Sequence, residues 1–177
     1  MSEEGLTLWT IGHSTRTLGE FLDLLAVDAI EAQADVRRFP ASRKHPHFDQ
    51  DALCNSLPGI GVEYVPLPEL GGRRRPRPDS HNTVWHNESF RGYADYMETE
   101  EFCAGIERLL ELARRKRTAV MCAEAVWWRC HRSLIADYLK SAGVCVRHII
   151  DGTHSEIHPY TSAARVRDGK VSYSPGE

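Results

Sequence analysis

The sequence lacks the features that would direct it to a membrane or into secretion. No apolar run approaches the roughly 18 residues that a membrane-spanning helix requires. The first ten residues, MSEEGLTLWT, are acidic and contain no positive region followed by a long apolar stretch, which is the pattern of a signal peptide. We therefore expect a cytoplasmic protein with no membrane partner.

The sequence also lacks a disulfide pattern and carries no excess of positive charge. The five cysteines are an odd number at scattered positions, namely Cys54, Cys103, Cys122, Cys130 and Cys145. This pattern is not that of a disulfide framework, and it predicts free or metal-bound thiols in a reducing compartment. The formal net charge of −3 excludes a protein that binds nucleic acid through overall positive charge, although a local basic patch remains compatible.

The composition that is present is typical of one folded domain. The chain has 177 residues, of which 41% are hydrophobic and 27% are charged. Five short apolar runs, at 6–11, 30–36, 62–67, 118–122 and 144–150, alternate with amphipathic stretches. This alternation predicts a single α/β domain over residues 1–177, with a mostly parallel sheet of about five strands and helices on both faces.

Local signals place the helices between these runs. Thr17 and Glu20 form a predicted capping box, and Asp49 is a predicted N-cap with Phe48 and Leu53 spaced as a hydrophobic staple. Further helices are expected at 90–97, at 100–115 and from about 134 to Gly143. Residues 73–89 are expected to form a long loop, and residues 153–177 a polar, irregular tail.

Polar residues follow each predicted strand. In parallel sheets, ligands bind outside the carboxyl ends of the strands. We therefore expect one shared site, built from His13, Ser14, Arg16, Asp35, Arg37, Ser42, Arg43, Glu69, Gly71, Gly72, Cys122, Glu124, Cys130, His131, Arg132 and Asp151.

Several separated motifs in this sequence resemble the DUF488 family, a prokaryotic domain of unknown function. They are TIGHSTRTLGEF (10–21), ADVRRFPASRKHPHF (34–48), EYVPLPELGGRR (63–74), FRGYADYM (90–97), MCAEAVWWRCHRSLIADYL (121–139) and VRHI (146–149). The resemblance covers roughly residues 8–152. It differs from the family pattern in the connector 125–129, AVWWR, where an Asp-Pro pair is common. The resemblance implies a fold and a set of motif residues, but no reaction or cofactor.

The candidate catalytic residues are Cys122, Cys130, Glu124 and His13. Cys130 opens a predicted helix beside His131 and Arg132, and a helix N-terminus with adjacent cations favours the thiolate. Glu124 is the preferred general base, because burial among the tryptophan rings of the same loop would raise its pKa. The competing interpretation is that both cysteines are small core residues.

The candidate anion-binding residues are Arg37, Arg43, Arg132, Ser14, Gly71 and Gly72. Guanidinium groups and a helix N-terminus suit phosphate, and paired glycines let backbone amides approach it. Asp35, Glu69 and His131 are expected to support the site. Asp35 and Arg37 share a face of their strand, which suits either an ion pair within the site or a purely structural salt bridge.

Three functions follow from these residues. The leading hypothesis is an enzyme, or an enzyme-like domain, that acts on a phosphate-bearing ligand such as a nucleotide or a nucleic-acid end. The second is a non-catalytic nucleic-acid-binding module that uses the Arg73–Arg77 loop and stacks bases on Trp127 and Trp128. The third is a thiol or metal sensor, with Cys122, Cys130, His131 and His13 as a possible zinc set. Core packing of the tryptophans and solvation of the arginine run are the structural alternatives.

Overall fold

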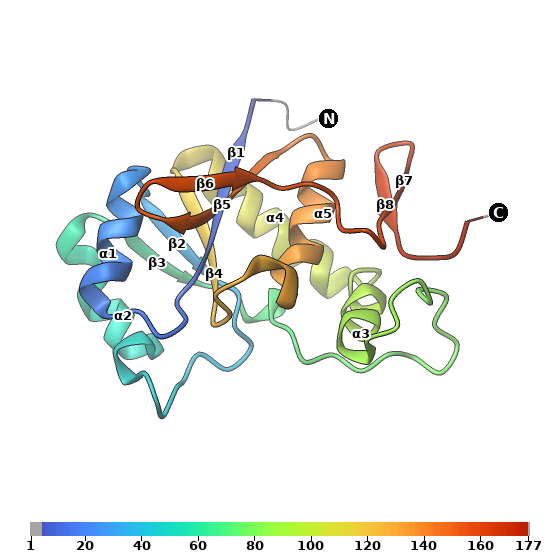
Figure 1. The fold of residues 1–177 in the computed structure, drawn as a ribbon, viewed down its shortest axis with the longest axis horizontal. Helices are drawn as coiled ribbons and strands as arrows, with labels where there is room; N and C mark the ends of the chain where they lie inside the picture. The colour runs from blue at the N-terminus through green and yellow to red at the C-terminus, as the bar shows by residue number, and fades with distance from the viewer. Residues whose placement is uncertain (1–4, 177) are drawn as a thin grey trace.

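The computed structural model describes residues 5–176; residues 1–4 and 177 of the predicted domain lie outside the described residues. A six-stranded sheet of order β3-β2-β4-β1-β5-β6 forms its centre (Figure 1). Its strands are β1 (Thr7–Gly12), β2 (Ala32–Asp35), β3 (Glu63–Pro66), β4 (Thr118–Cys122), β5 (Cys145–Asp151) and β6 (His154–Ile157). The first five run parallel and β6 is antiparallel to β5, so the predicted α/β class with a mostly parallel sheet is confirmed.

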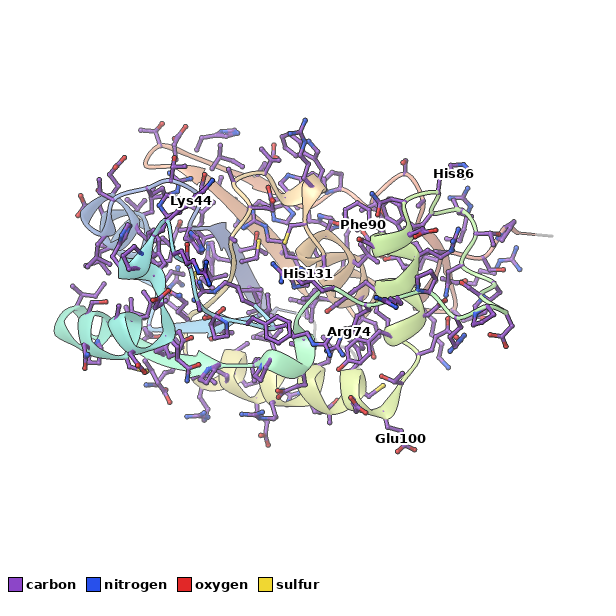
Figure 2. All side chains as sticks on the ribbon, turned by 90° about the horizontal axis from the view of Figure 1, so that it is seen from below. Lys44, Arg74, His86, Phe90, Glu100 and His131 are labelled. Atoms are coloured by element: carbon purple, nitrogen blue, oxygen red, sulfur yellow. The ribbon has the colours of Figure 1, made fainter. Side chains whose placement is uncertain are left out.

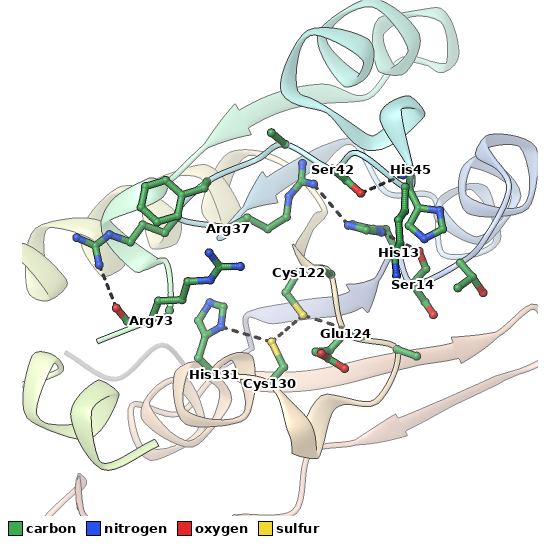
Figure 3. A pocket seen from close by; sticks show the side chains of 18 of the residues that line it. His13, Ser14, Arg37, Ser42, His45, Arg73, Cys122, Glu124, Cys130 and His131 are labelled. Carbon is green, nitrogen blue, oxygen red and sulfur yellow. Dashed lines mark hydrogen bonds between the residues drawn. The ribbon is translucent and has the colours of Figure 1, made fainter. Parts of the chain in front are cut away.

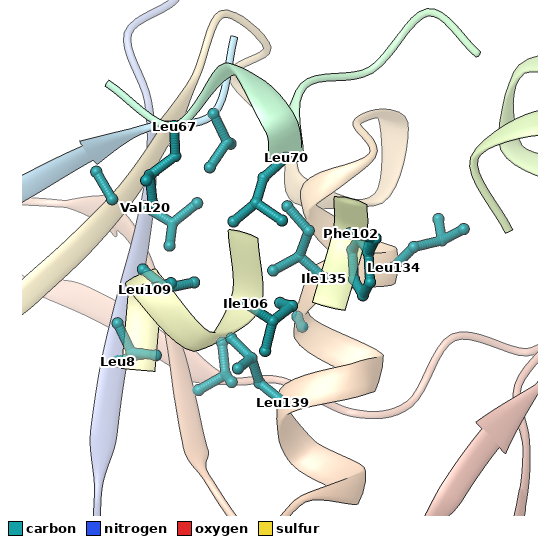
Figure 4. Close-up of a cluster of buried hydrophobic side chains, with 14 of the residues drawn as sticks. Leu8, Leu67, Leu70, Phe102, Ile106, Leu109, Val120, Leu134, Ile135 and Leu139 are labelled. Carbon is teal, nitrogen blue, oxygen red and sulfur yellow. The ribbon is translucent and has the colours of Figure 1, made fainter. Parts of the chain in front are cut away.

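Helices cover both faces of this sheet, as predicted. The helices are α1 (Leu18–Val27), α2 (Gln50–Ser56), α3 (Glu88–Tyr96), α4 (Glu100–Arg115) and α5 (Arg132–Ser141). Side chains alternate along β1, so that Trp9 and Ile11 join a core with α1 and α2, whereas Leu8 joins the larger core with α4 and α5. Figure 4 shows the larger core, in which Ile106, Leu109 and Leu139 are almost fully buried.

The N-termini of α1 and α2 test the helix caps predicted from the sequence. The capping box is present, since Thr17 Oγ1 accepts from the Glu20 amide at 3.1 Å and Glu20 Oε1 accepts from the Thr17 amide at 3.0 Å. Asp49 occupies the N-cap position of α2, but its carboxylate accepts from the Ser42 amide at 2.6 Å and makes no side-chain cap. The carboxylate thereby fixes the loop after β2, which lies beside the site described below.

The segment after residue 152 differs from the predicted irregular tail. It supplies β6 and a separate hairpin of β7 (Arg165–Arg167) and β8 (Lys170–Ser172). Asp168 and Gly169 both have positive φ at the hairpin turn, as a type I′ turn requires. These strands are short and mostly exposed, so they lack the alternating apolar pattern from which a strand is predicted.

The loop expected at 73–89 is present up to the start of α3, and it is held by a buried carboxylate. Asp95 of α3 accepts from the Arg77 amide at 2.8 Å, from Ser80 Oγ at 2.7 Å and from Asn82 Nδ2 at 2.8 Å. Across residues 5–176, no helix combines the length and apolar character needed to cross a membrane.

Candidate active site at the carboxyl edge of the sheet

A cavity of about 570 Å³ lies beyond the carboxyl ends of β1, β2 and β4 (Figure 3). Ten of the residues that the sequence assigned to the site line it: His13, Ser14, Arg37, Ser42, Arg43, Gly72, Cys122, Glu124, Cys130 and His131. The parallel strands thus bring segments that are far apart in the sequence to one place. Figure 2 shows Lys44 and Arg74 projecting on opposite sides of His131.

Two buried thiols form the floor of this cavity. Cys122 ends β4, Cys130 directly precedes His131 and α5, and their Sγ atoms lie 2.7 Å apart. The His131 ring lies next to them, with Nδ1 at 3.5 Å from Cys130 Sγ and Nε2 at 2.9 Å from the Val36 carbonyl oxygen. A bond to a carbonyl places the ring proton on Nε2, so Nδ1 is the acceptor that faces Cys130. Burial lowers the pKa of His131, which keeps the ring neutral.

Arg132 does not reach the cavity, contrary to its predicted role as an anion contact. Its side chain is fully buried, Nη2 donates to the Ala125 carbonyl at 3.1 Å, and Nε and Nη1 have no hydrogen-bond partner. It is buried because α5 packs almost all of its surface inside the protein. The Arg132 charge therefore acts on the neighbouring thiols and not on a ligand in the cavity.

The two thiols differ in their tendency to ionise. Burial opposes ionisation of Cys130, but the hydrogen bond from Cys122 and the Arg132 charge together lower its pKa below the usual value. Burial, followed by the interaction with Cys130, raises the pKa of Cys122 well above the usual value. Of the two thiols, Cys130 therefore ionises the more readily, and Cys122 keeps its proton.

His13 and Arg37 form the opposite wall. Asp35 binds Arg37 through two contacts, Nε to Oδ1 at 2.9 Å and Nη2 to Oδ2 at 2.8 Å, and Tyr64 Oη donates to the same carboxylate at 2.5 Å. Arg37 Nη1 faces His13 Nε2 at 3.5 Å, and the His13 ring stacks on Phe48 at 4.5 Å between ring centroids. Burial lowers the pKa of His13 to about 4, so its imidazole is neutral near pH 7.

The mouth of the cavity is strongly cationic. Arg38, Lys44 and Arg73 line it together with Arg37 and Arg43, and Arg38 Nη1 donates to the Arg73 carbonyl at 3.0 Å. Glu124 is the one carboxylate among the described residues that line it. Its side chain is exposed, so the predicted burial among tryptophan rings is wrong.

Phe39 and His45 also line the mouth, and the sequence-based assignment of the site missed both. The guanidinium carbons of Arg38 and Arg73 lie 5.4 and 5.8 Å from the Phe39 ring centroid, and Phe39 is 60% exposed. The available signal in the sequence was an aromatic residue inside the arginine-rich run RRFPASRK.

Comparison with known proteins gives one finding. A family model described as domain of unknown function DUF488 matches residues 17–139, which is more than half of the chain. The chain belongs to the DUF488 family. The resemblance found in the sequence motifs is thereby confirmed. No curated protein matches the chain, and no solved structure matches it either.

Most of the cavity of this DUF488 chain lies within the matched region, which runs from α1 to α5 and contains Arg37, Cys122 and His131. His13 and Ser14 come just before it, on the turn that follows β1. The β5–β6 pair and the β7–β8 hairpin come after it. The family match therefore covers the thiol pair and the cationic mouth, but not the C-terminal strands.

Several predicted residues of the DUF488 site lie outside the cavity. Glu69 pairs with Arg108, Asp151 binds Thr153 in a turn, and a Cβ on Gly71 would lie 2.5 Å from Arg38 Cα. Arg16, also expected at this edge, donates to the carbonyl oxygens of Gly12 and Ile150. Gly71 therefore serves chain packing and not an approach to a ligand.

The tryptophans and the arginine loop are also separate from the cavity. Trp127 stacks on His148 with 4.6 Å between ring centroids, and its Nε1 donates to Glu156 at 2.6 Å. Trp128 is exposed but does not line the cavity. Arg74 lies over the Tyr96 ring at 3.7 Å, and Arg77 pairs with Glu98 at 3.1 Å. Of the Arg73–Arg77 loop, only Arg73 lines the cavity.

The possible zinc set is not assembled in the described residues. His131 Nε2 is hydrogen-bonded to the Val36 carbonyl oxygen. His13 Nε2 faces the Arg37 guanidinium and not the thiols. Within residues 5–176, no group of three or more His, Cys, Asp or Glu side chains is arranged to hold a metal ion.

Proposed function

We propose that this DUF488 protein is an enzyme that binds a phosphate-bearing ligand, such as a nucleotide or a nucleic-acid end, in the cavity and reacts with it through Cys130. The proposal rests on the charge of the cavity lining, which contains five arginine and lysine residues but only one carboxylate among the described residues, that of Glu124. A concentration of one sign of charge in a concave site attracts a ligand of the opposite sign.

The ligand phosphate would be held at the mouth, where Arg43, Lys44 and Arg73 come from two different loops. Guanidinium groups bind phosphate through paired hydrogen bonds, which are among the stronger ones in proteins. Arg37 supports this arrangement from inside. Two of its nitrogens are fixed by Asp35, so Nη1 is oriented at little entropic cost.

The reactive group would be the Cys130 thiolate. His131 Nδ1, with its ring oriented by Val36, is the nearest proton acceptor, and Cys122 Sγ lies 2.7 Å from the reactive sulfur. Glu124 lies at the cavity surface, where it can serve as a general base. His13, which is neutral, closes the wall on the side of Arg37.

This geometry favours the enzyme over the nucleic-acid-binding module. That module depends on Trp127, Trp128 and the arginines of the Arg73–Arg77 loop. Trp127 is packed against His148, and Arg74 and Arg77 contact groups of the protein itself. These residues therefore do not form a surface for base stacking next to a basic groove.

Calorimetric titration of the full chain with inorganic phosphate and with adenosine monophosphate tests the proposal. We expect R43Q/K44Q/R73Q to weaken binding of both ligands more than tenfold, since a hydrogen bond to a charged group contributes about 1.5–3 kcal/mol. R115Q/R165Q/K170Q removes the same charge at exposed positions away from the cavity and should leave the affinity nearly unchanged.

Equal loss in both triple variants would contradict a specific phosphate site. A single-stranded oligonucleotide that binds the wild-type protein more tightly than the monophosphate does, with affinity falling steeply as salt rises, would support the binding module instead. If Cys130 is the reactive group, C130S should bind phosphate as the wild type does but lose any turnover of the ligand.

A further inference from the structure

The close contact between the Cys122 and Cys130 sulfurs is suited to a redox reaction that needs no ligand in the cavity. We propose that Cys130 and Cys122 are a peroxide-oxidisable pair, in which Cys130 is oxidised first and Cys122 then closes an intramolecular disulfide. This goes beyond the proposed function, because it requires only the two thiols, their buried counter-charge and a hydroperoxide as oxidant.

The distance between the sulfurs is the first argument. The Sγ atoms lie 2.7 Å apart, within about 0.7 Å of the bonded distance in a disulfide. The two residues are only eight positions apart, but they come from different elements, the end of β4 and the turn before α5. Closing the bond therefore requires a small local movement and no rearrangement of the sheet.

Arg132 is the second argument. It is fully buried, and no carboxylate among the described residues pairs with it. A buried guanidinium without a counter-charge is unfavourable, because its lost hydration is not replaced. Cys130 is the adjacent group that can supply a negative charge, and its Sγ lies 3.5 Å from the Arg132 amide nitrogen, which donates to it. The position of Arg132 is thus explained when Cys130 is a thiolate.

The neighbouring groups assign different roles to the two sulfurs. Cys130 is faced by Cys122 from β4, by Glu124 from the loop, by Tyr93 from α3, and by His131 and Arg132 at the start of α5. Burial and the Glu124 charge oppose its ionisation, while Cys122 and Arg132 favour it more strongly and lower its pKa. Cys122, whose pKa burial raises, keeps its proton. Thiolates react with peroxide and thiols do not, so Cys130 is the site of attack.

The cavity gives peroxide access to the thiol pair, and a proton acceptor lies beside it. Cys122 and Cys130 both line the cavity, whose volume of about 570 Å³ is ample for a molecule as small as hydrogen peroxide. The neutral His131 ring, whose Nδ1 lies 3.5 Å from Cys130 Sγ, is a proton acceptor beside the pair for the proton that Cys122 must lose. Cys54 and Cys103 are more exposed but lie outside the cavity.

The reaction balances in two steps. The Cys130 thiolate attacks one oxygen of hydrogen peroxide, the O–O bond breaks, and hydroxide leaves and becomes water, so that Cys130 is a sulfenic acid. Cys122 then loses its proton, attacks the Cys130 sulfur and displaces hydroxide, which takes up that proton as water. Two thiols have been oxidised and one peroxide has been reduced to two waters.

The test uses the full chain with Cys54, Cys103 and Cys145 replaced by serine. After one equivalent of hydrogen peroxide, we expect the intact mass to fall by two hydrogens, and non-reducing peptide mapping to join Cys122 to Cys130. Adding C122S should leave a sulfenic acid on Cys130 that dimedone labels, whereas adding C130S should give no dimedone label on Cys122.

Three results would overturn the proposal: no loss of mass, a dimedone label on Cys122 alone, or oxidation of Cys54 ahead of Cys130 in the wild-type chain. R132Q should slow oxidation more than tenfold, and R132K, which keeps the charge, should be several-fold faster than R132Q. If R132Q does not fold, the two cysteine variants still decide the matter. Because no phosphate is present, the result is independent of whether the cavity binds one.

Discussion

Gly12 and Glu124 lie so close together that a Cβ at residue 12 would fall 1.7 Å from the Glu124 carbonyl oxygen. Gly12 is the last residue of β1 and is paired in register with Cys122. Beyond it, the His13 amide donates to the Cys122 carbonyl at 2.9 Å, and the Ser14 amide donates to the Ala123 carbonyl at 2.9 Å. The turn after β1 and the loop after β4 are therefore held backbone to backbone, and this contact sets the position of the thiols relative to His13.

Replacing Gly12 by alanine should separate these two segments. We expect G12A to lower the free energy of unfolding by about 1–3 kcal/mol or more, because the added methyl group meets backbone atoms that cannot rotate away. Urea unfolding followed by circular dichroism measures this change. G59A is the matched control, since a Cβ there meets nothing within 4 Å. If G12A is as stable as G59A, the close approach of the two loops is not a feature of the folded protein.

Stability should depend on pH through His13. Burial lowers its pKa to about 4 in the folded protein, against 6.5 for an exposed histidine, while Arg37, Asp35 and His45 are the charged and titratable groups around it. The unfolded chain therefore binds a proton that the folded protein does not, and stability is lost as pH falls from about 6.5 to about 4. H13Q should show a shallower loss over this range.

Urea unfolding at a series of pH values from 7 to 4 measures this slope. H86Q serves as the control, because His86 is exposed on the loop before α3. We expect H86Q to show the same dependence of stability on pH as the wild type. A slope for H13Q equal to that of H86Q would show that His13 is accessible to protons in the folded state.

The sequence predicted those parts of the structure that depend on local patterns. The five parallel strands, the α/β class and the capping box at Thr17 follow from apolar periodicity and from residue types a few positions apart. The meeting of His13, Arg37 and Cys122 at one edge followed from a rule of topology, which applies once the strands are parallel.

The positions of individual side chains could not be predicted from the sequence, because they depend on what packs around each of them. Arg132 resembled a cation at a helix start, and its burial becomes visible only when α5 is packed on the sheet and covered by the C-terminal segment. Trp127 resembled a stacking platform, but His148 of β5 covers its ring. Phe39 gave no periodic signal, because it lies in a loop whose position is set by Asp49 and the end of β2.

The C-terminal segment is joined to α5 by a buried polar network, which leads to the last prediction. Asp137, fully buried on α5, accepts from Thr161 Oγ1 at 2.6 Å and from Tyr173 Oη at 2.8 Å, and its other oxygen lies 2.7 Å from His158 Nε2. His158 Nδ1 in turn lies 2.8 Å from His148 Nε2. One carboxylate thus binds polar groups of three residues in the segment that follows β5, namely His158, Thr161 and Tyr173.

D137A should lower the free energy of unfolding by about 3–5 kcal/mol, because the partners of the carboxylate remain buried without it. Y173F removes one hydrogen bond and should cost about 0.5–1.5 kcal/mol. D79A removes only an exposed carboxylate 3.6 Å from Arg77 Nε and should change stability by less than about 1 kcal/mol. Urea unfolding ranks the three variants, and limited proteolysis should cleave D137A first within residues 153–177. Equal stability of D137A and D79A would mean that the C-terminal strands are held by their apolar contacts, Tyr173 and Ala163 among them, and not by this carboxylate.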